Sequence, residues 1–432
     1  MEINQYYRNQ SDGLKIRINA LKRWNKWWII AEILCAVGVA IAVVSMFVWP
    51  LKVWMFGLAI AFILLWMVLS RFDQRNGKHI LALKACHEVL HLELLALSGD
   101  YSHFHSGQEY VNPHHEYSFD LDVFGKGSLF NRIARTVTDG GSDFLAGSLI
   151  NLKWEKSRPA AMRELSQQES FMTRFKSQRI LQGERINTRK MLKAIEELSS
   201  FHLPSILTGK LAGICSLLIP AGFIIAVLLS VFDIISWLIP VWWGIIQIIL
   251  VSIFCNKSLK GVERTADNLD KISVGYADLV KLITEADFHS AKNREIQSCL
   301  EGSGEAFNVL RQVLNSLNSR ANIIGLILFN LLFLSDFQLI RKFAKWQRLC
   351  SRQMRGWVDA VSEMDALVSM ATAWFNHPEA IWAEIVDSKD LIFEAHGLYH
   401  PFLGKRAVPN DFDLKSHEFT LVTGANMAGK ST

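Results

Sequence analysis

Four long apolar runs constrain the fold of this chain more than any other feature of its sequence. The first two cover residues 27–49 and 53–70, and Glu32 is the only charged residue in either of them. Pro50 and Lys52 stand between the runs and indicate a turn. Each run is close to the ~20 residues that a helix needs to cross a bilayer. The pattern therefore predicts a first transmembrane hairpin.

A second pair of apolar runs covers residues 211–232 and 234–255, with only Asp233 between them. Buried helices of a soluble protein are the alternative, but such helices seldom run this long without a polar face. The mean hydropathy of +0.18 also favours a membrane protein. Tryptophans stand mostly near the ends of the runs, as interfacial anchors do. They are Trp24, Trp27, Trp28, Trp49, Trp54, Trp237, Trp242 and Trp243.

Basic residues flank both predicted hairpins on their outer sides. Cytoplasmic flanks of membrane helices carry an excess of Lys and Arg, so both ends of each hairpin are expected in the cytoplasm. We therefore predict a multi-pass protein of the cell membrane whose bulk is cytoplasmic, and not a cleavable signal peptide. The flanking cations are Arg8, Lys15, Arg17, Lys22, Arg23, Lys26, Arg71, Arg75, Lys78, Lys84, Lys210, Lys257, Lys260 and Arg264.

Outside the hairpins the chain has the pattern of a mainly α protein. Apolar residues recur every three to four positions over 160–200, 256–320 and 337–375, which predicts long helices with charged faces. Glycine-rich or aspartate-rich turns are expected at 98–128 and 139–147.

A shorter apolar run, Ile323 to Leu334, favours a buried core helix over a fifth span.

The six cysteines form no CxxC pair, which favours a reducing compartment over a disulfide scaffold.

The pattern changes after Asp387 to short strands joined by turns. Strands are expected at 391–393 and 418–423, with turns at Gly404 and at 409–411. This is typical of the opening of an α/β domain.

A phosphate-loop motif, GxxxxGK[ST], follows the apolar segment Phe419–Val422 directly. Its glycines let backbone amides face phosphates, Lys430 can reach the β and γ phosphates, and the Ser431 hydroxyl can bind Mg²⁺. ATP and Mg²⁺ are thus the predicted ligands, with Lys430 as the catalytic residue and Ser431 as the metal ligand. The nucleotide-binding residues are Gly424, Ala425, Asn426, Met427, Ala428, Gly429, Lys430, Ser431 and Thr432.

His87, Glu88 and His91 form a competing HExxH motif that could hold Zn²⁺ on one helix face, as in membrane metalloproteases. Histidines on an amphipathic helix are common, so a solvated helix face is the alternative interpretation. Possible third ligands are His103, His105, Glu109, His114 and His115.

Residues 423–432, TGANMAGKST, resemble the phosphate loop of the MutS family of DNA mismatch repair ATPases. Residues 400–403 (HPFL) and 408–411 (VPND) resemble elements that open the family's ATPase domain. Residues 120–138 and 363–371 (EMDALVSMA) are similar to the start and the end of its helical core. The resemblance covers residues from about 118 to 432, apart from the second hairpin.

The resemblance implies a helical core and lever that feed a P-loop ATPase domain, which dimerises and binds mismatched or structured DNA. His400, Pro401 and Asn410 would shape that domain. Three features depart from the family: Ala425 replaces a loop proline, Ala407 stands where an aromatic often stacks on adenine, and the first hairpin takes the place of the mismatch-reading domain. The chain has no Phe-x-Glu triplet, and we expect no basic stripe on its cytoplasmic helices.

Three functions follow as hypotheses: an ATP-dependent DNA-binding protein at the membrane, an ATPase switch that acts on membrane or protein partners without DNA, and the metalloprotease. We expect the sequence to stop within the ATPase domain, so that the 432 residues alone do not hydrolyse ATP.

The predicted segments are a basic N-terminus with the first hairpin (1–75), a first helical part (76–205), the second hairpin (206–255), the lever (256–390) and the start of the ATPase domain (391–432).

Overall fold

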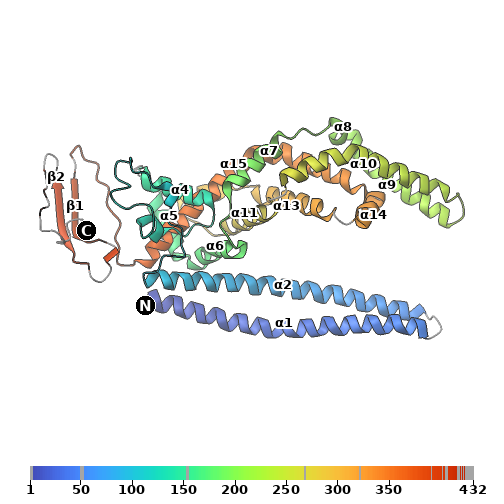
Figure 1. The fold of residues 1–432 in the computed structure, drawn as a ribbon, viewed down its shortest axis with the longest axis horizontal. Coiled ribbons are helices and arrows are strands. Elements are labelled where there is room, and N and C mark those ends of the chain that lie inside the picture. Colours follow the sequence, from blue (N-terminus) through green and yellow to red (C-terminus); the bar gives the residue numbers. More distant parts are fainter. Residues whose placement is uncertain are drawn as a thin grey trace. The chain divides into compact units, whose positions relative to one another are not determined.

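The computed structural model describes residues 3–48, 53–151, 155–266, 269–320, 323–390, 392–400, 402–403, 407–415, 419, 421 and 423. The chain forms two compact units, Met1–Pro378 and Glu379–Thr432. As predicted, the protein is mainly helical (Figure 1).

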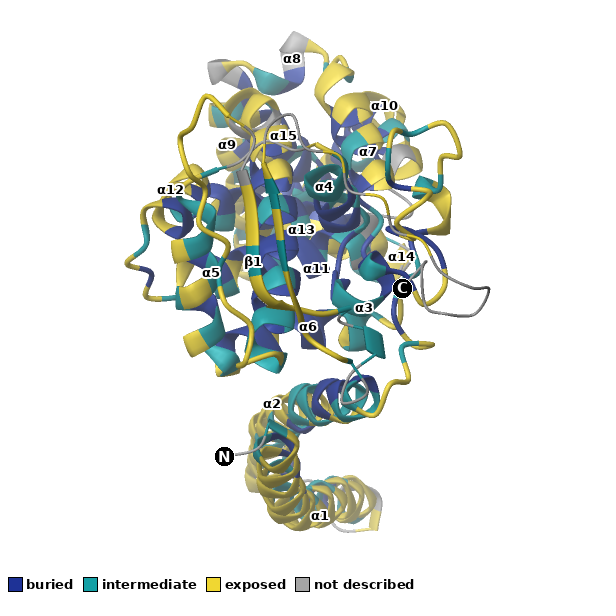
Figure 2. Cartoon of the chain, turned by 90° about the vertical axis from the view of Figure 1, so that its left-hand side faces the viewer, coloured by how far each residue is buried: buried dark blue, intermediate teal, exposed yellow. Residues whose placement is uncertain are grey.

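The first hairpin consists of α1 (Ile3–Val48) and α2 (Val53–Leu97), and both helices continue far beyond the apolar runs. Apolar side chains of the predicted spans face outward, and Figure 2 shows that much of this hairpin is exposed. Inside the hairpin, Gly38 of α1 lies so close to the Phe62 ring that a Cβ there would be 2.9 Å from it. The polar half is joined by a 2.8 Å hydrogen bond from Asn76 Nδ2 to Asn25 Oδ1. Each helix is therefore one continuous rod with an apolar half and a polar half.

The second hairpin consists of α9 (Lys210–Val231) and α10 (Leu238–Ala266). Within the first unit, the apolar ends of both hairpins point to the same side (Figure 1, right). Four described helices, α1, α2, α9 and α10, are long and apolar enough to cross a membrane.

The prediction of a buried core helix at residues 323–334 is wrong. Helix α14 (Ile323–Phe333) packs against α9 and α10, and its apolar side chains are exposed, Ile323 by 69% and Ile324 by 80%. Its only buried residue is the polar Asn330. Because the run is apolar on every face, its pattern cannot separate a protein core from lipid contact. With α15, from which it is bent by 79°, α14 is a candidate for a fifth, broken span or a re-entrant loop.

The helical body of the first unit is built around α15 (Ser335–Asn376), which confirms the helix predicted at 337–375. The predicted helix at 160–200 is divided into three, because the chain breaks at Gln168 and at Gly183, whose φ of 81° ends α6. The other helices are η1 (Gln108–Tyr110), α3 (Leu129–Ile133), α4 (Asp139–Ile150), α5 (Arg158–Gln167), α6 (Glu169–Gln182), α7 (Thr188–Ser200), α8 (Ser205–Thr208), α11 (Leu269–Thr284), α12 (Ala291–Cys299) and α13 (Ser303–Ser319).

The turn predicted at 139–147 is also wrong, because these residues form most of α4. Its glycines serve close packing and not a change of chain direction, as the site below shows.

The second unit contains β1 (Ile392–Leu398) and β2 (Asn410–Lys415). They pair antiparallel, with Phe393 opposite Leu414 and Ala395 opposite Phe412. The predicted strand at 391–393 is thus longer than expected. Residues 419, 421 and 423 have no regular secondary structure, since no described segment pairs with them, and the rest of the strand predicted at 418–423 lies outside the described residues.

Candidate functional site

The predicted phosphate loop, residues 424–432, lies outside the described residues, and so does Pro401. Lys430 and Ser431 therefore stay predictions for the catalytic cation and the metal-binding hydroxyl. Thr423, which begins the family-like signature, is described and exposed.

Two residues expected to shape the ATPase domain make local hydrogen bonds in the second unit. The Phe402 amide donates to His400 Nδ1 at 3.2 Å, and Asn410 Nδ2 donates to the Val408 carbonyl at 3.0 Å. Both bonds hold a turn, and neither places a side chain toward a ligand.

In the first unit, the described structure brings together two of the stretches that resemble the MutS core, and they meet at Asp365 of α15. This fully buried carboxylate accepts hydrogen bonds from the Val137 amide at 3.0 Å and from the Thr138 amide and hydroxyl at 2.8 Å. Burial raises the pKa of Asp365 to about 7, although these donors oppose the rise. One side chain thus joins segments 228 residues apart.

Two glycines at the start of α4 make this contact possible. Thr138 caps the helix by accepting a 2.8 Å bond from the Gly141 amide. A Cβ on Gly141 would lie 2.5 Å from Asp365 Cγ, and one on Gly140 would collide with Ser362. The first turn of α4 therefore lies directly against side chains of α15, with no side chain of its own between them.

A second buried polar cluster ties α2 to the same end of α15. Glu93, which is 1% exposed, accepts hydrogen bonds from Arg135 Nε at 3.0 Å and from Lys176 Nζ at 2.9 Å. Burial alone would raise the pKa of Glu93, but the two cations outweigh it and lower the pKa to about 2. Asn376, the last residue of α15, donates to Glu93 at 3.2 Å and accepts a 2.8 Å bond from the Tyr7 hydroxyl. The cluster connects the first hairpin to the C-terminal end of α15.

Helix α15 joins these contacts to the part of the unit that contains α13 and α14. It has 42 residues, a length of ~63 Å at the usual helical rise. Its first turn contacts α13 through Asp336, and its last turns carry Asp365 and Asn376. The two sets of contacts are therefore joined by one continuous helix.

The HExxH motif lies on α2. Among the described residues, no group of three or more His, Cys, Asp or Glu side chains could hold a metal ion. Burial lowers the pKa of His87, which favours the neutral ring. The suggested third ligands form other contacts: His105 bonds to Glu109 at 2.9 Å and lies 2.8 Å from Arg185. The described structure therefore gives the zinc hypothesis no ligand set.

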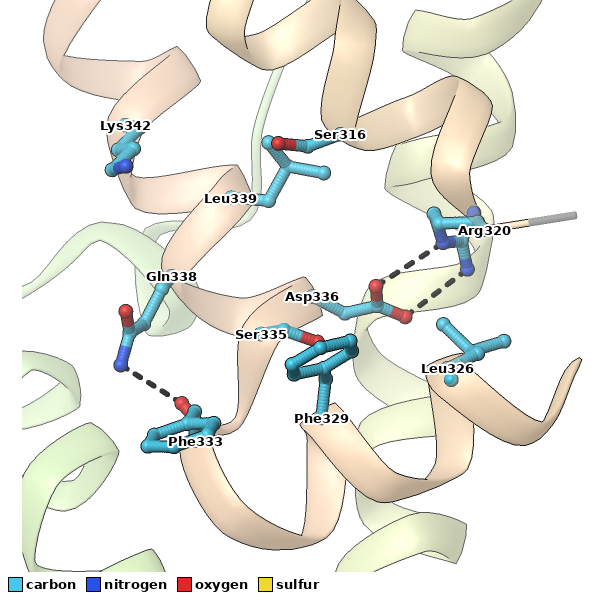
Figure 3. A pocket seen from close by; sticks show the side chains of 11 residues that line it. Ser316, Arg320, Leu326, Phe329, Phe333, Ser335, Asp336, Gln338, Leu339 and Lys342 are labelled. Atoms are coloured by element: carbon cyan, nitrogen blue, oxygen red, sulfur yellow. Dashed lines mark hydrogen bonds and ion pairs between the residues drawn. The ribbon is translucent and has the colours of Figure 1, made fainter. Parts of the chain in front are cut away.

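A cavity of about 590 Å³ lies where α13, α14 and α15 meet (Figure 3). Its most polar feature is a pair of hydrogen bonds from Arg320 to Asp336, each 3.1 Å long. Nearby, Asn330 Oδ1 accepts from the Asp336 amide at 3.0 Å, and Gln247 Nε2 donates to the Asn330 carbonyl at 2.8 Å. Among the described residues, Gln247 Oε1 has no hydrogen-bond partner, but the other polar groups bond to one another. We interpret them as the polar contacts that hold the bend between α14 and α15.

The sequence analysis missed two kinds of residue. Glu93 interrupts an apolar stretch of α2, a signal for a buried charge, but nothing local identifies Arg135 and Lys176 as its partners. The expectation that no cytoplasmic helix has a basic stripe is also wrong for α15, where Arg341, Lys342, Lys345 and Arg348 line one pocket. Their near-helical spacing was visible in the sequence.

Comparison with known proteins finds no matching family model, no matching curated protein and no matching solved structure.

Proposed function

We propose that this chain is a membrane-anchored, MutS-like ATP-binding protein in which α15 couples nucleotide binding to the membrane helices. The observation that carries the proposal is the sequence TGANMAGKST at residues 423–432. The Asn-Met pair inside this loop is more specific than the general phosphate-loop motif. In this proposal Lys430 binds the β and γ phosphates, Ser431 binds Mg²⁺, and the backbone amides of the loop bind the remaining phosphate oxygens.

The contact at Asp365 supports the lever role of α15. Residues 135–138 and 363–371 resemble the two ends of the family's helical core. The hydrogen bonds from Val137 and Thr138 to Asp365 join these two stretches directly.

The first test is nucleotide binding. The chain, purified in a neutral detergent with Mg²⁺, is titrated with a fluorescent ATP analogue. Lys430→Ala should weaken binding by at least tenfold, because it removes the cation that faces the phosphates. Lys389→Ala removes an exposed lysine outside the motif and should leave binding unchanged. Equal binding by the two variants would refute the nucleotide site.

The first candidate target is mismatched or branched DNA, which the resemblance implies together with a homodimer through the ATPase domain. Binding to DNA should weaken steeply as salt rises, since it depends on phosphate contacts. A gel-shift titration with a mismatched duplex at 50 and 200 mM salt measures this. The same duplex without the mismatch is the control, and no binding at the lower salt would exclude the DNA function.

A second candidate is an ATPase switch that acts on the membrane or on protein partners. It rests on the position of α15, which begins at the bend beside the membrane helices and is held there by Arg320 and Asp336. An ATP affinity that is equal with and without DNA, but changes when the protein moves from detergent into lipid, would favour this candidate. We place the bulk of the chain outside the membrane helices on the cytoplasmic side, and only the short turns of the hairpins on the other side. Accessibility labelling of Cys299 in intact cells can test that orientation.

A further inference from the structure

Four cations on one stretch of α15 line a pocket beside the start of α9. They are Arg341, Lys342, Lys345 and Arg348, and the pocket has a volume of about 460 Å³. Thr208, Ser216 and Leu217 of the α8–α9 segment form its other wall.

One of the four cations contacts α9 directly. Arg341 lies across Gly213, where a Cβ would be 2.6 Å from the guanidinium, and its Nη1 lies 3.5 Å from the Ser216 hydroxyl. Lys342, Lys345 and Arg348 are all exposed. Within the described ranges no carboxylate forms an ion pair with any of the four. The pocket therefore has a concentrated positive charge that no carboxylate of the described residues neutralises.

An apolar slot lies next to this pocket and shares one lining residue with it. It has a volume of about 300 Å³, shares Ser216 with the basic pocket, and runs between α9 and α10 along Ile219, Leu250 and Phe254. Leu217, on the rim, is 69% exposed on the face of a candidate span. Ser216 is about 9 Å along α9 from its first residue, so it lies near one end of this candidate span.

We infer that these two pockets bind one anionic phospholipid, with its phosphate among the α15 cations and one acyl chain in the slot between α9 and α10. Basic pockets beside membrane helices are suited to anionic headgroups. A nucleic-acid backbone would satisfy the cations but would leave the apolar slot empty, so the pair of pockets favours lipid. The inference rests on the membrane placement of α9 and α10 in the proposed function, and it does not depend on ATP.

The test is a titration of the purified chain, in a neutral detergent, with dioctanoyl phosphatidylglycerol. The double variant Lys345→Gln/Arg348→Gln should bind about thirtyfold more weakly, from the usual contribution of two juxtamembrane cations. The matched control is Arg352→Gln/Arg355→Gln, which removes two exposed cations of the same helix that do not line the pocket. The control should change the affinity by less than threefold.

Three further probes identify the ligand. Dioctanoyl phosphatidylcholine, which has no net charge, should bind at least tenfold more weakly than the anionic lipid, and glycerol 3-phosphate should compete only at far higher concentration. Equal binding of the two lipids, or equal loss in both double variants, would overturn the inference. Efficient competition by glycerol 3-phosphate would reduce the site to one for phosphate alone, and displacement of the lipid by duplex DNA would assign it to nucleic acid. Loss of lipid binding with intact ATP binding would leave the nucleotide proposal standing.

Discussion

The close approach of α4 to α15 predicts that Gly141→Ala destabilises the protein strongly. A Cβ at this position would lie 2.5 Å from Asp365 Cγ and 2.7 Å from its Cβ, closer than real Cβ atoms come. The carboxylate cannot swing aside cheaply, because the Val137 and Thr138 donors hold it. Overpacking of this kind costs about 1–3 kcal/mol, and leaving a buried hydrogen-bonding group unsatisfied adds about 1–3 kcal/mol.

An alanine gains about 0.5–1 kcal/mol over glycine in a helix, which offsets part of this loss. The net expectation is a destabilisation of about 2–5 kcal/mol. Gly147→Ala, in the same helix, is the matched control, because its Cβ would meet only Asn151 at 3.8 Å. That variant should be neutral or slightly more stable than the parent.

Thermal unfolding of the full chain in one detergent, followed by circular dichroism, measures both variants. In an Asp365→Ala background, Gly141→Ala should lower the melting temperature by less, because the carboxylate is gone and only the contact with the Cβ atom of residue 365 is left. A melting temperature for Gly141→Ala equal to that of Gly147→Ala would refute the close packing of α4 on α15.

Three other predictions use the same thermal assay. Glu93→Gln leaves two buried cations without their anion and should lower the free energy of unfolding by about 3–5 kcal/mol. Glu197→Gln, at an exposed position, should change the stability little. Similar melting temperatures of the two variants would contradict the buried cluster. The pKa of Asp365 is raised from 3.8 to about 7, so its contribution to stability is greatest below pH 4 and is lost as pH rises to 7. The stability difference between the parent and Asp365→Asn should therefore depend on pH over this range. A constant difference would count against the raised pKa. Gln247→Leu removes two hydrogen bonds to the end of α14 and should lower the free energy of unfolding by about 1 kcal/mol. Gln338→Leu loses one exposed hydrogen bond and should have a smaller effect. The reverse order would argue against the polar contacts that hold the bend between α14 and α15.

Several features of the fold were predictable because their signals are local. Apolar runs near the thickness of a bilayer identified α9 almost to the residue and the apolar part of α10, which begins four residues later and ends eleven residues later than predicted. The charge-free run at 53–70 identified the apolar half of α2, but not its continuation to Leu97, because the polar half is ordinary amphipathic helix. Arg158 and Pro159 correctly marked the start of α5.

Other features were predicted wrongly because the same local signal has two physical causes. Glycines at 139–147 suggested a turn, but Gly140 and Gly141 are there to let α4 touch α15. The run at 323–334 suggested a core helix, but a helix that is apolar all round is equally suited to lipid.

By itself, the sequence determined that the chain contains four membrane-length apolar segments and a phosphate-loop signature, because both depend on residues that are neighbours along the chain. Only the tertiary structure decided that Asp365 binds Val137 and Thr138, that Glu93 is neutralised by Arg135 and Lys176, and that the α15 cations stand beside the apolar slot of α9 and α10. These contacts join residues that are far apart in sequence. Their partners are chosen by how the helices pack, and no local pattern records that choice.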